Sequence, residues 1–100
     1  SQTQQECRFG PYRFNLKDQR LWHEEEQIHL TSAEASYLAA LAQKQNQPVD
    51  RETLAQTAGQ PESNARAVDV QINRLRKKLE PHPSKPIYLQ TVRGEGYVLK

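Results

Sequence analysis

The side chains of residues 66–80, RAVDVQINRLRKKLE, have the types and spacing needed to read nucleic acid bases. At about 100° per residue, the apolar side chains fall in one narrow stripe of a helix, formed by Val68, Ile72, Leu75 and Leu79. The opposite stripe is mostly polar and contains Arg66, Val70, Asn73 and Lys77, with Arg74 beside it. The pattern predicts a helix that packs by one edge and offers the other to a groove.

A polar stripe is usually only a solvated helix face, and charge alone would support that interpretation. Val70 argues against it, because solubility would favour a charged residue there, whereas a valine can contact a thymine methyl group. Asn73 and Arg74 carry planar donor groups that suit adenine and guanine edges. Lys77 and Arg76 are interpreted as phosphate contacts, lysine in particular being a point charge without planar fork geometry.

Asp69 is the one acidic residue within this polar surface. It lies one helical turn from Arg66 and from Asn73. Because residues three or four apart are neighbours on a helix, we expect Asp69 to hold those two side chains in place.

A second basic element follows in residues 91–99, TVRGEGYVL. Its two strands would be joined by Arg93, Gly94, Glu95 and Gly96, and the glycines can adopt positive φ. Arg93 would then lie near the tip of a hairpin. A groove-binding helix beside a basic hairpin indicates duplex DNA as the ligand.

Composition limits the classes of protein that fit. One hundred residues suit one small domain, and no run of apolar residues is long enough to span a membrane. Residues 1–50 contain five Lys/Arg and seven Asp/Glu, net −2, whereas residues 51–100 contain nine and five, net +4. The basic half contains the helix and the hairpin, so the domain can orient on a polyanion. The single cysteine, Cys7, suits a reducing cytosol.

The remaining pattern predicts the order of elements. The first residues, SQTQQE, resemble the end of a linker and contain no secretion signal. We therefore expect a tail over residues 1–7 and a domain over residues 8–100, and we expect the sequence to be a piece of a longer chain. Short strands are predicted over residues 9–16, 20–23 and 27–30, the first bent at Gly-Pro. Helices are predicted from a Thr31–Glu34 capping box to about residue 45, from Asp50 to Gly59, and over residues 66–80. Three prolines should stop the third helix before strands at residues 87–92 and 97–99.

Three motifs in this order resemble the DNA-binding effector domain of OmpR/PhoB-type response regulators: LTSAE at residues 30–34, AVDVQINRLRKKLE at residues 67–80 and YLQTVRGEGYVL at residues 88–99. The OmpR subgroup is the most similar, through VDVQI with Gln71. The resemblance implies an α+β fold, a winged helix-turn-helix with an N-terminal antiparallel four-stranded sheet, three helices and a C-terminal β-hairpin wing.

The resemblance also implies how such a domain works, in two-component transcription regulation in the cytoplasm without cofactor or catalysis. The third helix would enter the major groove and the wing the adjacent minor groove, with some preference for A·T-rich flanks. DNA would be faced by Arg66, Val70, Asn73, Arg74 and Arg76 from the helix and by Thr91 and Arg93 from the wing. Binding in tandem on direct repeats and a preceding receiver domain, absent from this chain, are expected. RNA polymerase would be met by a loop that here is short and lacks an aromatic residue, formed by Gly59, Gln60, Pro61, Glu62, Ser63 and Asn64.

Other chemistry receives less support. His23, Glu24, Glu25, Glu26 and His29 could only ligate a metal if they converged, and an acidic solvated turn explains them better. We expect Phe9, Tyr12, Phe14 and Trp22 to pack in the sheet, and Tyr97 to pack beneath the wing. No phosphate-binding loop, zinc-protease or hydrolase motif occurs, and Cys7 has no identifiable base.

Two alternatives to a regulator with a receiver stay open. The same helix could dock on an acidic protein partner, or the domain could belong to a membrane-tethered regulator that lacks a receiver. We expect the fragment to be monomeric without DNA. Target promoter, signal and the choice between activation and repression cannot be predicted from these residues.

Overall fold

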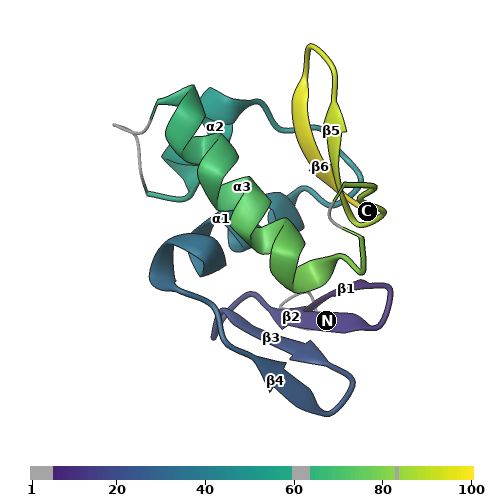
Figure 1. Cartoon of the computed structure of the whole chain (residues 1–100). Helices are drawn as coiled ribbons and strands as arrows, with labels where there is room; N and C mark the ends of the chain where they lie inside the picture. The colour runs from purple at the N-terminus through teal and green to yellow at the C-terminus, as the bar shows by residue number, and fades with distance from the viewer. Residues whose placement is uncertain (1–5, 60–63, 83) are drawn as a thin grey trace.

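Six strands and three helices make up the part of the chain that the structure, a computed structural model, describes: residues 6–59, 64–82 and 84–100. Their order is β1 (Glu6–Phe9), β2 (Tyr12–Asn15), β3 (Arg20–His23), β4 (Glu26–Ile28), α1 (Ser32–Gln43), α2 (Arg51–Thr57), α3 (Ala65–Leu79), β5 (Leu89–Val92) and β6 (Gly96–Leu99). The first four strands form one antiparallel sheet in chain order, and β5 and β6 form a separate hairpin (Figure 1). The expected α+β winged helix-turn-helix is confirmed.

The N-terminal sheet differs from our expectation in two details. Residues 9–16 are two strands, because Gly10 has a φ of +59° and the Gly10-Pro11 bend is the turn of a complete β1–β2 hairpin. The sheet also begins earlier than the predicted boundary after residue 7. Glu6 pairs with Asn15, and Cys7 pairs with Phe14 and is buried at 5% exposure. Those two residues therefore belong to the domain, while residues 1–5 lie outside the described part.

Local capping explains where the helices begin. The Thr31 hydroxyl accepts from the backbone of Glu34, whose carboxylate accepts from the backbone of Thr31, so the capping box is confirmed. Asp50 caps α2 by accepting from Thr53. Asn64 caps α3 by accepting from Ala67, which starts this helix at residue 65. Each helix start is thus set by the side chain of the residue that precedes it.

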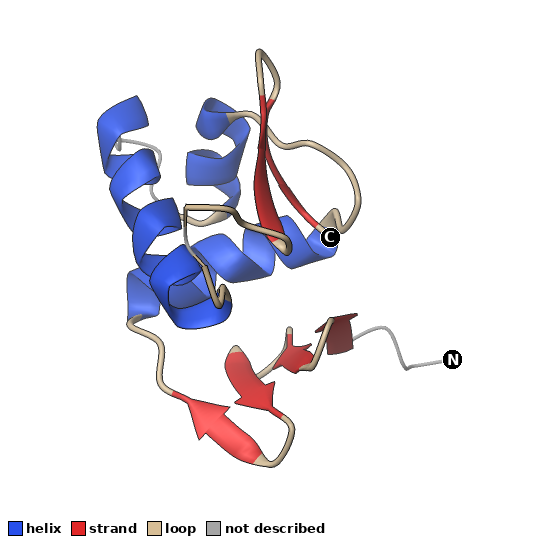
Figure 2. Ribbon diagram, turned by 45° about the vertical axis from the view of Figure 1, so that its right-hand side comes forward, coloured by secondary structure: helices blue, strands red, loops and turns tan. Residues whose placement is uncertain are grey.

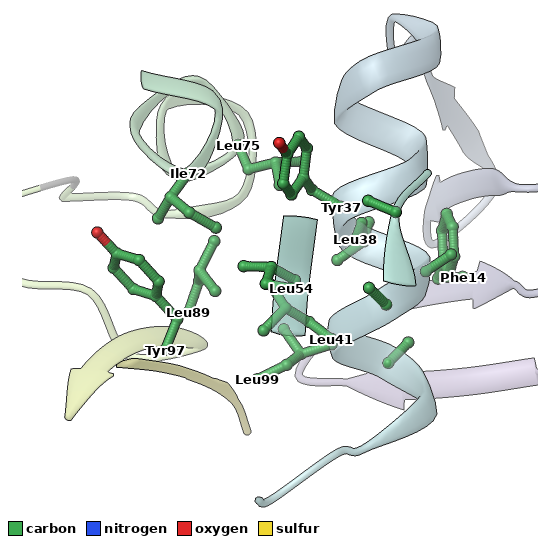
Figure 3. Packing of buried hydrophobic residues seen from close by; sticks show 14 of the residues in the cluster. Phe14, Tyr37, Leu38, Leu41, Leu54, Ile72, Leu75, Leu89, Tyr97 and Leu99 are labelled. Carbon is green, nitrogen blue, oxygen red and sulfur yellow. The ribbon is translucent and has the colours of Figure 1, made fainter. Parts of the chain in front are cut away.

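The apolar stripe of α3 forms the centre of the core. Val68, Ile72, Leu75 and Leu79 are at most 1% exposed. Figure 3 shows Ile72 facing Leu89 and Tyr97 from the hairpin, and Leu75 beside Tyr37 of α1. Phe9, Tyr12 and Phe14 are buried as predicted, whereas Trp22 is only half-buried. Since this edge of α3 is filled by packing, its orientation on the domain is determined.

The C-terminal end of α3 is attached to both sheets by polar contacts. The Tyr12 hydroxyl donates to the backbone oxygen of Leu79 at 2.6 Å. Lys78 donates to the Glu34 carboxylate at 2.5 Å and to the His29 carbonyl at 2.9 Å. The Glu80 carboxylate, only 5% exposed, accepts three backbone N–H groups at 2.8–2.9 Å, from Ile87, Tyr88 and Leu89. These contacts fix the connection between α3 and β5.

The arrangement leaves the hairpin free at one end of the molecule. Figure 2 shows the four-stranded sheet below the helices and the β5–β6 hairpin projecting at the opposite end, beside α2. Among the described residues, no helix is long and apolar enough to cross a membrane.

Candidate nucleic-acid interface

One face of α3 is uncovered and carries the predicted base-reading side chains. In Figure 1 this helix crosses in front of α1, and the hairpin stands to its right. The predicted face is exposed at every position: Arg66, Val70, Asn73, Arg74 and Lys77. Val70 is 41% exposed, and among the described residues Ile87 is the one other large apolar residue that is exposed. The prediction that this stripe is free in the monomer is confirmed.

Arg76 does not share that exposure. It is half-buried between α3 and the hairpin, where its Nε donates to the Leu89 carbonyl at 3.0 Å and its Nη2 donates to the Thr91 hydroxyl at 2.6 Å. Its guanidinium also lies over the Tyr97 ring, 5.5 Å from the centroid. The phosphate contact of Arg76 stays a prediction, and within the domain its hydrogen bonds are with the hairpin.

Asp69 also has other partners than the ones we predicted. Its carboxylate accepts from Arg51 Nε at 2.8 Å and from the Tyr97 hydroxyl, and no hydrogen bond joins it to Arg66 or Asn73 among those found between described residues. Asp69 lies on the edge of α3 that faces the hairpin, so residues distant in the chain reach it first. The expectation that it holds Arg66 and Asn73 is therefore wrong.

The electrostatics of this cluster favour an ionised carboxylate. Burial raises the pKa of Asp69, but hydrogen bonds from Tyr97 and Arg51 and the charges of Arg51 and Arg76 outweigh it, so the pKa lies below its ordinary value. Burial and the hydrogen bond to Asp69 raise the pKa of Tyr97. Asp69 thus stays charged and Tyr97 stays protonated at neutral pH.

The hairpin presents Arg93 at its exposed tip. Thr91, Arg93 and Glu95 are exposed, and Gly94 and Gly96 have φ values of +81° and +125°, as the turn requires. Tyr97 is buried at 5% exposure, which confirms that it packs beneath the wing. A groove between the start of α2 and the hairpin includes Arg51 and Arg93 in its walls. Two arginines thus line the groove between α2 and the hairpin.

The structure describes the loop assigned to RNA polymerase only in part, and it describes the acidic β3–β4 turn completely. Of the loop assigned to RNA polymerase, Gly59 and Asn64 are exposed, while Gln60, Pro61, Glu62 and Ser63 lie outside the described residues. His23 and the glutamates of the β3–β4 turn line an open hollow, but no group of three metal-ligating side chains converges within residues 6–59, 64–82 and 84–100.

Comparison with known proteins identifies the domain. The family described as "Transcriptional regulatory protein, C terminal" matches residues 24–99. The chain belongs to this family. The effector domain is 40% identical over 97 residues to Protein PetR of Rhodobacter capsulatus, covering 90% of this chain and 41% of PetR. It is 38% identical over 92 residues to the regulatory protein VirG of Rhizobium rhizogenes, covering 89% of this chain and 38% of VirG. The effector domain therefore spans about two fifths of these relatives.

Solved structures agree with this assignment. The effector domain matches the DNA-binding domain of Klebsiella pneumoniae RstA, solved in complex with the RstA box, with a TM-score of 0.80 at 30% identity, covering 94% of this chain and 95% of that one. It matches the response regulator DrrB, an OmpR/PhoB homologue of Thermotoga maritima, with a TM-score of 0.84 at 30% identity, covering 95% of this chain and 44% of DrrB. The resemblance to OmpR/PhoB-type DNA-binding domains is confirmed.

Two residues that hold α3 to its neighbours were not predicted from the sequence. Arg51 was interpreted only as part of a short helix, and Glu80 only as the last residue of a long one. Their partners lie 18 residues away for Arg51 and seven to nine residues away for Glu80. A basic residue just after the Asp50 cap and an acidic residue at a helix C-terminus were the available signals, the second because it opposes the helix dipole.

Proposed function

We propose that this effector domain binds double-stranded DNA with sequence preference and controls transcription as the output of a two-component response regulator. The observation that carries the proposal is the exposed, chemically mixed face of α3, with Val70 at 41% exposure among arginine, asparagine and lysine. A solvated face would not need an apolar side chain at its centre. A major groove presents both hydrogen-bonding edges and thymine methyl groups to such a face.

The exposed residues of α3 divide by their chemistry. Arg66, Asn73 and Arg74 carry planar donor groups suited to base edges, and Val70 offers apolar contact. Lys77 is a flexible point charge, and we assign it to a phosphate. This arrangement places specificity in the planar side chains and salt-dependent affinity in the lysine.

The wing supplies a second contact. Arg93 at its exposed tip would enter the minor groove next to α3 and would favour the narrow groove of A·T-rich DNA. The Thr91 hydroxyl accepts from Arg76 and keeps its own O–H for a phosphate. We assign Arg76 to holding the wing, with any phosphate contact secondary.

Further features are proposed from the family alone. The full-length protein would carry a receiver domain before this one and act in the cytoplasm. Two effector domains would bind in tandem on direct repeats, and the loop of residues 59–64 would meet RNA polymerase. The greater length of PetR and VirG, of which this chain spans about two fifths, supports the expectation of a further domain, and the other features rest on the family resemblance.

Selection of duplexes from a random pool tests the proposal. The recovered duplex and a scrambled version of it would be titrated with the domain by fluorescence anisotropy at several salt concentrations. Arg74→Ala should lower affinity for the recovered duplex by about 1–3 kcal/mol and relax preference at one base pair. Lys77→Ala should weaken all duplexes alike and reduce the salt slope by about one unit.

A control variant separates readout from general charge. Arg20→Ala removes an equal charge from an exposed position of β3, away from the proposed interface, and should leave the base preference unchanged. Equal binding to every duplex, or the same effect from all three substitutions, would contradict base readout. Absence of binding to any duplex at low salt would instead favour docking of α3 on an acidic protein partner.

A further inference from the structure

Asp69 is the meeting point of three elements. It belongs to α3, and its carboxylate accepts from Arg51 at the start of α2 and from the Tyr97 hydroxyl of β6. Both Arg51 and Arg76 lie over the Tyr97 ring, at 5.6 Å and 5.5 Å from its centroid, which is within the range of cation–π attraction. One carboxylate and one aromatic ring thus join the helix-turn-helix to the wing.

The two strands of the wing reach α3 through different side chains. Arg76 binds β5 through the Leu89 carbonyl and the Thr91 hydroxyl. Tyr97 joins β6 to Asp69. Asp69 and Arg76 lie on the edge of α3 that faces the hairpin, while Asn73 lies one turn from Asp69 on the exposed face. The direction of the wing is therefore set relative to the side chains proposed to read bases.

The base of β6 has a separate attachment that does not depend on this cluster. The backbone N–H of Tyr97 donates to the Val49 carbonyl at 2.9 Å, and the Val49 N–H donates to the Tyr97 carbonyl at 2.8 Å. Loss of the Tyr97 hydroxyl would leave these bonds and the buried ring in place. The hydroxyl can accordingly be removed without detaching the strand.

We propose that Asp69, through Arg51 and Tyr97, is a positioning residue that holds the wing at the angle from α3 needed to engage two adjacent grooves at once. This inference rests on the proposed function, because the angle matters only if both elements meet DNA. Asp69 itself would touch no base or phosphate, since its charge is already satisfied by arginine. Preorganisation of this kind removes part of the ordering cost of binding.

A double-mutant cycle tests whether the wing depends on this cluster. Affinity for the duplex recovered by selection would be measured for the unmodified domain, Tyr97→Phe, Arg93→Ala and the double variant. If the hydroxyl positions the wing, Arg93→Ala should cost about fivefold less affinity when Tyr97 is already phenylalanine. A merely structural hydroxyl would give additive effects.

Tyr12→Phe is the matched control. It also removes a buried tyrosine hydroxyl, one that donates to Leu79 at 2.6 Å, but from the N-terminal sheet and not from the wing. Its effect should add to that of Arg93→Ala. Coupling of equal size in both cycles would overturn the proposal, because it would show a general loss of rigidity.

A measurement without DNA separates this inference from the proposed function. Residual dipolar couplings of backbone amides would compare the orientation of β5–β6 with that of α3 in the free domain. Tyr97→Phe and Asp69→Asn should change or average the wing couplings, and Tyr12→Phe should not. Unchanged wing couplings in both variants, or additivity in the cycle, would overturn the positioning role. Equal affinity of the unmodified domain for all duplexes would overturn sequence readout by the domain. The residual dipolar couplings would still decide how the wing is held.

Discussion

Replacing Glu80 by glutamine is a direct test of how α3 is joined to the wing. The Glu80 carboxylate is buried and accepts the backbone N–H groups of Ile87, Tyr88 and Leu89. Glutamine has nearly the same shape but only one acceptor oxygen. Its NH₂ group would face at least one backbone N–H, which would then lack a partner.

Two effects of the substitution oppose each other. A negative charge at a helix C-terminus is unfavourable by about 0.3–1 kcal/mol, so its removal would stabilise α3. Against this, an unsatisfied buried N–H costs about 1–3 kcal/mol, and the surviving bonds lose the strength that a charged acceptor gives them. We expect a net loss of about 2–4 kcal/mol. For a chain of this length, each kcal/mol lowers Tm by about 5 °C, so the loss would lower Tm by about 10–20 °C.

Urea and thermal unfolding followed by circular dichroism would measure this loss. Glu25→Gln makes the same chemical change at an exposed turn position and should alter stability by less than about 0.5 kcal/mol. A Glu80→Gln domain as stable as the unmodified one would refute the reasoning, because the three hydrogen bonds would then contribute no net stability.

Three further predictions follow from contacts described above. The pKa values of Glu34 and Asp69 are lowered, in each case by hydrogen bonds and opposite charges that outweigh burial. The stability that these two carboxylates give to the fold is therefore complete above their ordinary pKa values of 4.5 and 3.8, and it is lost as pH falls below them. Lys78→Met should make this acid loss of stability shallower in urea titrations at several pH values, whereas Lys77→Met, at an exposed position, should leave its slope unchanged. Gly96→Ala should destabilise the domain by about 2 kcal/mol or more, because φ is +125° and the new methyl group would overlap the Val49 carbonyl. Gly94→Ala, which is also at positive φ but in open space, should cost only about 1 kcal/mol of stability. Equal losses for the two variants in thermal melts would contradict the overlap. Burial raises the pKa of Cys7 to about 11, so its thiol should resist a disulfide reagent at pH about 8 in the native domain and react once urea unfolds the domain. Rapid reaction of the Cys7 thiol in the native domain would show that β1 opens.

The helices could be predicted because their signals are local. Thr31 and Glu34 cap α1 from within one turn, and Asp50 caps α2 in the same way. The alternation of Val68 and Ile72 with polar residues separates the two edges of α3, and packing leaves that separation intact. Periodicity was sufficient for α3, since only one side of that helix is buried.

The errors concern residues whose role depends on partners distant in the chain. Asp69 was assigned from its neighbours along α3, but Arg51 of α2 and Tyr97 of the hairpin supply the groups that it binds. Cys7 was placed in a tail because its flanking residues are polar, yet strand pairing with Phe14 buries it. Nothing in the local sequence of such residues identifies the partner, because that depends on how the elements pack.

The residues of α3 that hold the fold are different from those proposed to read bases, and this has a consequence for how such domains change their targets. Asp69, Arg76 and Lys78 hold the fold together, while Val70, Asn73 and Arg74 make no hydrogen bond to another described residue through their side chains. Under the proposed function, substitutions at Val70, Asn73 and Arg74 would therefore alter the preferred operator with little loss of folding stability. Duplicated copies of this chain could diverge toward new promoters by exchanging only a few outward side chains, and a library randomised at those positions should yield mostly folded proteins.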